Sequence, residues 1–173
     1  MRVALVTSCF SPMVGGIERL VQDMAAEIAK SDDVLVVTRK DQRPSAPVRY
    51  AHTGLEGLVS CQTVQEVAET GCRLRQRLSD FGPDIVLFCD ALPLVHAEAI
   101  AGIAPTAAIV HGNDLTSPWA LWPEDPRPAI EAGLKSCGMA CVLSSHVGRL
   151  VSGVAPHLRV QQIPAGCDRS RFF

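Results

Sequence analysis

The stretch that decides the fold runs from residue 3 to residue 30 and reads VALVTSCFSPMVGGIERLVQDMAAEIAK. Its first five residues form a short apolar run, which predicts a buried strand. A loop over residues 8–14 leads to Gly15 and Gly16. After them, apolar residues recur at i, i+3, i+4, i+7, i+8 and i+11: Ile17, Leu20, Val21, Met24, Ala25 and Ile28. That spacing is typical of an amphipathic helix, so the unit reads strand, glycine loop, helix.

The two glycines lie where the first backbone N–H groups of this helix are not covered by any Cβ. The helix dipole is positive at the same place, so Gly15 and Gly16 suit a phosphate or diphosphate. The pair matches neither the dinucleotide fingerprint nor the P-loop, since a third glycine and a Lys-Ser/Thr pair are missing. The alternative explanation is a turn that simply admits the helix.

Composition limits the classes of protein that fit. The chain has 173 residues, of which 47% are hydrophobic and 20% charged, as expected for one globular domain. Its net charge of −2 offers no basic face for nucleic acid, and no apolar run is long enough for a membrane span or precedes the first strand as a signal peptide. Seven cysteines without a C-x-x-C pair indicate reduced thiols in a cytoplasmic protein and no metal site.

The rest of the chain alternates between the two kinds of element. Further strands are predicted at residues 34–38, 48–52, 84–89, 106–110, 139–143 and 158–163. Helices are predicted at residues 63–81, where Gly71 interrupts the pattern, and at residues 92–103, 129–136 and 145–152, with Ser145 as the cap of the last one. This order predicts an α/β, Rossmann-like open parallel sheet with helices on both faces.

Several polar residues and glycines directly follow the predicted strands. Because ligands of such sheets bind beyond the carboxyl ends of the strands, one edge should collect Gly15, Gly16, Asp90, His111 and Ser144. An imidazole at position 111 can donate a hydrogen bond to a substrate oxygen or exchange a proton near neutral pH. A histidine satisfied by the backbone is the alternative.

Residues 113–128 form the one long irregular stretch and contain four prolines and both tryptophans. A loop of this length in a compact domain is usually functional or flexible. Trp119 and Trp122 either stack on a sugar ring or pin the loop to the sheet. Arg73, Arg75 and Arg77 place positive charge on the second helix, where a solvated surface is favoured over contact with a membrane.

Five short motifs, taken together, resemble those of a known family. They are FSPMVGGIER at residues 10–19, PDIV at 83–86, VHG at 110–112 with Asp114, VLS at 142–144 with Arg149, and IPAGCD at 163–168 with Phe172. In this order they resemble the N-terminal domain of the GT-B fold glycosyltransferases of family 4. The resemblance covers essentially the whole chain and implies one half of a GT-B fold.

The resemblance implies a role for each matched position. Gly15 and Gly16 would approach the diphosphate of a nucleotide-sugar donor, and His111 would be the catalytic residue beside the transferred sugar. The segment that follows would shape the acceptor side of the site, through Asn113, Asp114, Trp119 and Trp122. The family transfers sugar with retention and usually needs no metal, so no cofactor is expected.

The resemblance also implies a partner. Residues 1–173 would be a single acceptor-side domain that lacks the C-terminal nucleotide-sugar domain, supplied by the same or a separate chain, so the lone chain should be inactive. Ala165 stands where the family normally has asparagine. The expected location is the cytoplasm, with peripheral contact at the inner face of the membrane as a weaker alternative. A non-catalytic binding or regulatory module and part of a sugar-nucleotide epimerase are the alternative functions.

Overall fold

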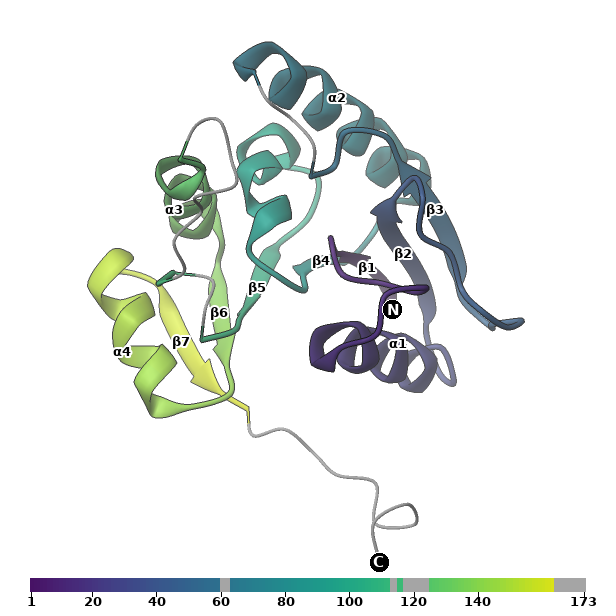
Figure 1. Ribbon diagram of the computed structural model, residues 1–173, viewed down its shortest axis with the longest axis horizontal. Helices are drawn as coiled ribbons and strands as arrows, with labels where there is room; N and C mark the ends of the chain where they lie inside the picture. The colour runs from purple at the N-terminus through teal and green to yellow at the C-terminus, as the bar shows by residue number, and fades with distance from the viewer. Residues whose placement is uncertain (60–62, 113–114, 117–124, 164–173) are drawn as a thin grey trace, which may run out of the picture.

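The computed structural model describes residues 1–59, 63–112, 115–116 and 125–163 (Figure 1). Seven parallel strands form one sheet in the order β3-β2-β1-β4-β5-β6-β7. The strands are β1 (Arg2–Val6), β2 (Asp33–Arg39), β3 (Ala51–Leu55), β4 (Ile85–Phe88), β5 (Thr106–Val110), β6 (Met139–Val142) and β7 (Arg159–Gln162). The α/β, Rossmann-like parallel sheet predicted from the sequence is confirmed.

Helices cover both faces of the sheet, as predicted. They are α1 (Gly16–Ile28), α2 (Val64–Phe81), α3 (Arg127–Ser136) and α4 (Ser145–Val154), together with the 3₁₀ segments η1 (Leu92–His96) and η2 (Glu98–Ile100). One core lies between α1 and the sheet, where Val21 and Ala25 pack with Val3 and Leu5. The other core joins α2, η1, η2, α3 and α4 to the opposite face (Figure 1). Among the described residues, no helix is long and apolar enough to cross a bilayer.

Most elements lie where hydrophobic patterning predicts them, and β5 has the predicted bounds. The strands read as continuous apolar runs because both faces are covered, so alternation is absent. The apolar stripe of α1 is confirmed, although Glu18 also lies on its buried side at 8% exposure. In α4 the cap is Ser144 rather than Ser145, because the Ser144 Oγ accepts a hydrogen bond from the Val147 N–H at 3.3 Å.

Two predictions of secondary structure are wrong. The third strand covers residues 51–55 rather than 48–52, in register with β2 from the Leu35–Ala51 pair onward. Residues 92–103 form η1 and η2 instead of one helix, and the segment ends where Ala101 leaves the helical region at ψ 136° and Gly102 has φ +82°. This compact segment fits between α2 and α3.

Two glycines allow that segment to approach its neighbours closely. In α2, a Cβ on Gly71 would come 2.6 Å from the Cβ of Ala99, so the glycine expected to weaken the helix serves packing instead. In α3, a Cβ on Gly133 would overlap the backbone carbonyl of Leu94. Close backbone contact, rather than a special dihedral angle, therefore requires glycine at both positions.

The buried face of α2 is not purely apolar. Its buried residues are Thr70, Gly71, Leu74 and Leu78, whereas Val64 is 84% exposed. A capping box formed by Thr63 and Glu66 starts the helix without help from the core.

The basic side chains of α2 bond partly to the protein itself. Arg75 Nη1 donates hydrogen bonds to the carbonyls of Ala99 and Ala101, at 2.9 and 3.0 Å. Arg73 Nη2 donates to Thr70 Oγ1 at 2.8 Å. These contacts favour a structural use of the arginines over a membrane-binding one.

We expect Gly133→Ala to lower the free energy of unfolding by about 3 kcal/mol, because the new methyl group overlaps backbone that cannot rotate away. Gly153→Ala is the matched control, since Gly153 also lies in a helix but a Cβ there meets nothing within 4 Å. The control should gain roughly 0.5–1 kcal/mol from helix propensity. Urea unfolding followed by circular dichroism measures both; equal effects of the two substitutions would contradict the packing argument.

Two histidines, the buried His96 and the half-buried His52, should make the fold less stable in mild acid. Burial lowers the pKa of His96 and of His52. At His96 the nearby charge of Arg73 adds to this effect, and the carbonyls of Leu58 and Val67 only partly oppose it. The unfolded chain therefore binds more protons than the native chain just below the ordinary histidine pKa of about 6.5.

It follows that the free energy of unfolding should fall by about 1 kcal/mol between pH 7.5 and pH 5.5. His96→Gln keeps a donor for the Leu58 carbonyl, which His96 Nε2 meets at 3.2 Å, and should flatten this dependence. His146→Gln, at an exposed position, serves as the control and should leave the dependence intact. Urea unfolding at both pH values provides the measurement, and an unchanged slope in His96→Gln would assign the pH dependence to other groups.

Candidate functional site

The candidate site lies at the carboxyl edge of the sheet, between β1 and β4. These strands are neighbours, but the chain leaves β1 toward β2 and leaves β4 toward β5. Such a switch point opens a crevice between the loops that follow the two strands, and ligands of open α/β sheets bind there. Gly15, Gly16, Asp90 and His111 all belong to loops or helix starts at this edge, as the strand order predicted.

A buried carboxylate bridges the switch point. Asp90, which follows β4 and is 3% exposed, accepts three hydrogen bonds from the residues that follow β1. Its Oδ2 accepts from Thr7 Oγ1 and from the Ser8 backbone N–H, both at 2.7 Å, and its Oδ1 accepts from Ser8 Oγ at 2.6 Å. Asp90 therefore positions the loop between β1 and α1.

Opposing effects act on the proton affinity of Asp90. Burial raises the pKa of its carboxyl group above its ordinary value, and the hydrogen bonds from Ser8 and Thr7 only partly offset this rise. Because three donors point at the two oxygens, a carboxylate fits this place without a further partner. The sequence marked Asp90 only by its position after a strand; its partners, Thr7 and Ser8, follow the neighbouring strand in the same way.

His111 is held between β4 and β5. Its ring is half-buried, and its Nε2 lies 2.9 Å from the backbone carbonyl of Cys89. A carbonyl can only accept, so the proton of the neutral ring lies on Nε2, and the hydrogen bond fixes the orientation of the imidazole. The alternative that a backbone hydrogen bond satisfies His111 is therefore true of its Nε2. The ring stands beside Asp90 at the predicted edge of the sheet.

The two glycines at the start of α1 have different surroundings. Both are exposed, and Gly15 is the N-cap, without a side-chain capping bond. A Cβ on Gly16 would meet nothing within 4 Å, whereas a Cβ on Gly15 would overlap the carboxylate of Glu18. Gly16 therefore leaves open space for a ligand, and Gly15 makes room for a side chain of its own helix.

A cavity of about 310 Å³ lies beside this helix start. Its wall includes Gly15, Glu18 and Gln22 of the helix region, Ser11 of the preceding loop, and Ser45 of the loop after β2. The hydrophobic pattern of α1 did not predict a buried glutamate. The available signal was the position of Glu18 in the first turn of a helix that has no capping side chain.

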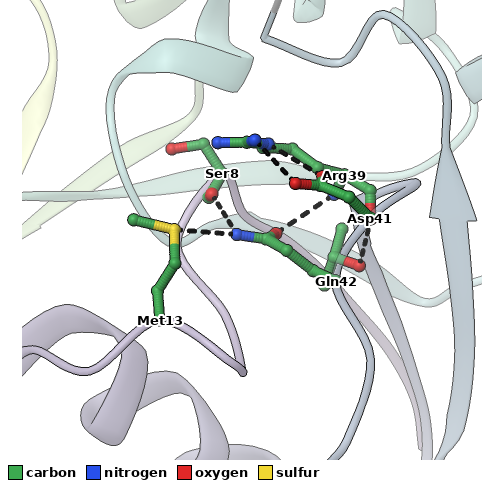
Figure 2. A network of polar contacts seen from close by, with 6 residues as sticks. Ser8, Met13, Arg39, Asp41 and Gln42 are labelled. Atoms are coloured by element: carbon green, nitrogen blue, oxygen red, sulfur yellow. Dashed lines mark hydrogen bonds and ion pairs between the residues drawn. The ribbon is translucent and has the colours of Figure 1, made fainter.

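The loop after β2 is fastened to the loop after β1 by Gln42 (Figure 2). This side chain is 2% exposed, and its Nε2 donates to the Ser8 carbonyl at 2.9 Å and contacts Met13 Sδ at 3.2 Å. Its Oε1 accepts from the Arg39 backbone N–H at 3.3 Å, and the Arg39 guanidinium pairs with Asp41. Sequence patterning identified this region only as a polar loop.

A second recess, of about 560 Å³, lies beyond the ends of β2 and β3. Leu55 and Leu58 contribute apolar surface to it, and Arg39, Lys40 and Glu56 line it with charge. Lys40 pairs with Glu56 at 2.8 Å and lowers the pKa of that carboxyl group. Its cations are already matched by carboxylates, so the recess offers no net charge for a ligand.

The remaining predicted site residues divide into two groups. Ser144 caps α4 and so has a structural task at the edge. The predicted acceptor-side residues lie outside the described residues: Asn113, Asp114, Trp119 and Trp122. Over the described ranges, no group of three His, Cys, Asp or Glu side chains could hold a metal ion, and Cys72, Cys89, Cys137 and Cys141 are free thiols. Burial raises the pKa of Cys137 to about 11.

Solved structures share this fold. A sucrose-phosphate synthase from Thermosynechococcus elongatus superposes with a TM-score of 0.70 at 16% identity, over 96% of this chain and 48% of its own. The lipopolysaccharide outer core galactosyltransferase WaaB gives 0.66 at 15% identity, over 98% and 47%. UGT2 of Phytolacca americana, in complex with UDP-2-fluoro-glucose and pterostilbene, gives 0.62 at 10% identity, over 99% and 56%. The chain thus spans about half the length of these structures.

Comparison with curated proteins finds no significant match by sequence. A family model, however, matches residues 14–171, which is nearly the whole chain and includes both glycines and His111. That model describes Glycosyltransferase Family 4. Together with the Rossmann-like sheet and its GT-B neighbours, it shows that this chain belongs to Glycosyltransferase Family 4.

Proposed function

We propose that this chain is the acceptor-side half of a two-domain enzyme that transfers a sugar, with retention, from a nucleotide sugar to an acceptor. The observation that carries the proposal is the convergence of Gly16, Asp90 and His111 on one edge of the sheet, at its switch point. Structural neighbours in complex with UDP-2-fluoro-glucose support a nucleotide sugar as the donor.

The donor diphosphate would approach α1 from the side of Gly16. Open space at its Cα admits a phosphate oxygen to the first backbone N–H groups of the helix, where the dipole favours negative charge. Asp90 would act at a distance as a positioning residue, since its bonds to Thr7 and Ser8 set the path of the loop that ends at these glycines.

His111 would stand beside the transferred sugar. Its imidazole is oriented by the Cys89 carbonyl and can contact sugar hydroxyls, whose hydrogen bonds strengthen as charge develops on the ring in the transition state. The segment that contains Asn113, Asp114, Trp119 and Trp122 would complete the acceptor side. No step in this scheme requires a metal or another cofactor.

A second domain would complete the cleft, from the same chain or a separate one. The chain covers about half of the neighbouring structures, which supports a missing half of similar size. Cationic groups of that half would neutralise the leaving diphosphate, because preorganised charge is usually the largest contribution to such catalysis. We therefore expect this chain alone to bind donor weakly and to be inactive.

In the full-length protein, His111→Ala should lower kcat/KM for sugar transfer by about 100-fold or more, because a group that contacts the sugar in the transition state is lost. Release of the nucleoside diphosphate from UDP-glucose and from a panel of other nucleotide sugars provides the measurement.

His157→Ala is the matched control. Its Nε2 also bonds to a backbone carbonyl, that of Lys135 at 3.1 Å, but it precedes β7, at the opposite edge of the sheet. The control should retain full activity. Unchanged turnover in a folded His111→Ala variant would instead favour the non-catalytic binding module, and epimerised donor without any acceptor would favour the epimerase.

Gly16→Ala and Gly15→Ala should separate ligand binding from folding. The methyl group at position 16 fills the space proposed for the diphosphate, so donor affinity of the full-length protein should fall about tenfold while stability is unchanged or slightly raised. The methyl group at position 15 collides with Glu18, so stability should fall by about 1–3 kcal/mol.

Isothermal titration with donor and thermal unfolding of both variants check this prediction. The double substitution Gly15→Ala/Glu18→Ala removes the collision and should recover most of the lost stability, as a positive coupling in a double-mutant cycle. Full donor affinity in Gly16→Ala would show that the start of α1 is not part of the donor site.

A further inference from the structure

The side chain of Gln42 is buried between the loop that follows β1 and the loop that follows β2, with 2% exposure. Its backbone N–H donates to the Arg39 carbonyl at 3.0 Å, and its Oε1 accepts from the Arg39 N–H at 3.3 Å. From this base at the end of β2, its Nε2 donates to the Ser8 carbonyl at 2.9 Å and contacts Met13 Sδ at 3.2 Å (Figure 2). The amide thus links the two loops through both of its ends.

An amide of this length satisfies both loops, and related side chains do not. A carbonyl can only accept and a backbone N–H can only donate, so Ser8 and Arg39 fix which end of the amide carries the nitrogen. A carboxylate at position 42 would direct an oxygen at the Ser8 carbonyl, and an apolar side chain would leave both backbone groups without this partner. Asparagine is one methylene shorter. The contact between the loops therefore requires glutamine.

Further contacts hold the same loop, residues 8–13, from the same side. The Arg43 backbone N–H donates to the Ser11 carbonyl at 3.0 Å. The fully buried ring of Phe10 stacks on His52 of β3, with 5.6 Å between the ring centroids and 19° between the ring planes. The loop is therefore held at several points before the chain reaches Gly15.

The start of α1 depends on this loop because the helix has no side-chain cap. Gly15 is the N-cap and makes no side-chain capping bond, and Gly16 follows as the first helical residue. The path of the preceding loop thus decides where the first free N–H groups of the helix point. A loop that is correctly placed for only a fraction of the time would lower the apparent donor affinity by that fraction.

We propose that Gln42 is a positioning residue that sets donor affinity, because it holds residues 8–13 so that the N–H groups at Gly16 are ready for the diphosphate. It acts from a buried place, through the loop. The proposal rests on the function proposed above and gives the loop after β2 a part in donor binding. Loss of the amide should raise KM and leave kcat nearly unchanged, since bound donor itself orders the loop. Loss of His111 should instead lower kcat.

Hydrogen exchange in the 173-residue chain tests the contact without any ligand. The Arg43 amide reports on it, since this N–H bonds across the two loops. Gln42→Met removes the amide at similar size and should speed exchange at Arg43 about tenfold, as expected for the loss of one buried hydrogen bond. Gln161→Met is the matched control, because Gln161 is exposed on β7 at the other end of the sheet, and it should leave the exchange rate unchanged.

Kinetics of the full-length protein test the positioning role. Gln42→Met should raise the donor KM about tenfold and change kcat less than about twofold, whereas Gln161→Met should change neither. Release of nucleoside diphosphate from UDP-glucose, or from the nucleotide sugar of the panel that the wild type cleaves best, provides both constants.

Gln42→Glu adds a pH-dependent rescue that general loosening of the fold would not produce. A protonated carboxyl group can donate to the Ser8 carbonyl and accept from the Arg39 N–H, as the amide does, but a carboxylate cannot. Burial should raise the pKa of the new carboxyl group, and so should the carboxylates bonded to its partners, Asp41 on Arg39 and Asp90 on Ser8. Its KM relative to the wild type should therefore be raised about tenfold or more at pH 8 and recover at pH 6.

Three results would overturn the proposal: an unchanged KM in Gln42→Met, a fall in kcat at constant KM, or a relative KM of Gln42→Glu that is the same at both pH values. Gln42→Met introduces no charge and provides the test alone should Gln42→Glu not fold. Faster exchange at Arg43 with an unchanged KM would leave Gln42 a purely structural role. A wild-type protein that cleaves no nucleotide sugar loses the proposed function itself, which the kinetics of the wild type show before any variant is compared.

Discussion

The hydrogen bonds between Asp90 and the pair Thr7 and Ser8 hold the two strands at the switch point in a fixed relation. Two further contacts of the candidate site extend from them. Gln42 fastens the loop after β2 to the carbonyl of Ser8, and His111 is oriented by the carbonyl of Cys89, the neighbour of Asp90 in the chain. The loops after β1, β2, β4 and β5 are therefore joined through a few buried polar bonds.

A buried network of this kind is costly to leave incomplete, because each unpaired group would lose its bonds to water without replacement. Asp90 accepts at both oxygens, and Ser8 bonds through its N–H, its hydroxyl and its carbonyl. The loop that carries the glycines is consequently held from β4 and from the loop after β2. A helix start held in this way can offer its N–H groups to a ligand without first being ordered.

Elements that depend on local periodicity could be predicted from the sequence. Elements and side-chain contacts that depend on residues far apart in the chain could not. The strands could be predicted because a short apolar run between two helical patterns is typical of a buried parallel strand. The edge that collects Asp90 and His111 then followed from the parallel order of the strands. Residues 92–103 look helical by composition, yet close packing against Gly71 and Gly133 forms 3₁₀ turns there. The three hydrogen bonds to Asp90 join residues that lie far apart in the sequence, so no local pattern encodes them. The buried position of Glu18 is not encoded by a local pattern either.

The charges along this edge bear on how the protein can act. A helix start contributes only about half a positive charge, and next to it lies the carboxylate of Glu18. Arg19, the adjacent cation, is paired with Asp23, and Arg39 and Lys40 are paired with Asp41 and Glu56. Such an edge can orient a sugar through hydroxyls and backbone groups, but its paired cations supply little net charge for a leaving diphosphate. A cleft whose other wall is cationic resolves the imbalance, which is the physical reason to expect the nucleotide from the opposite side.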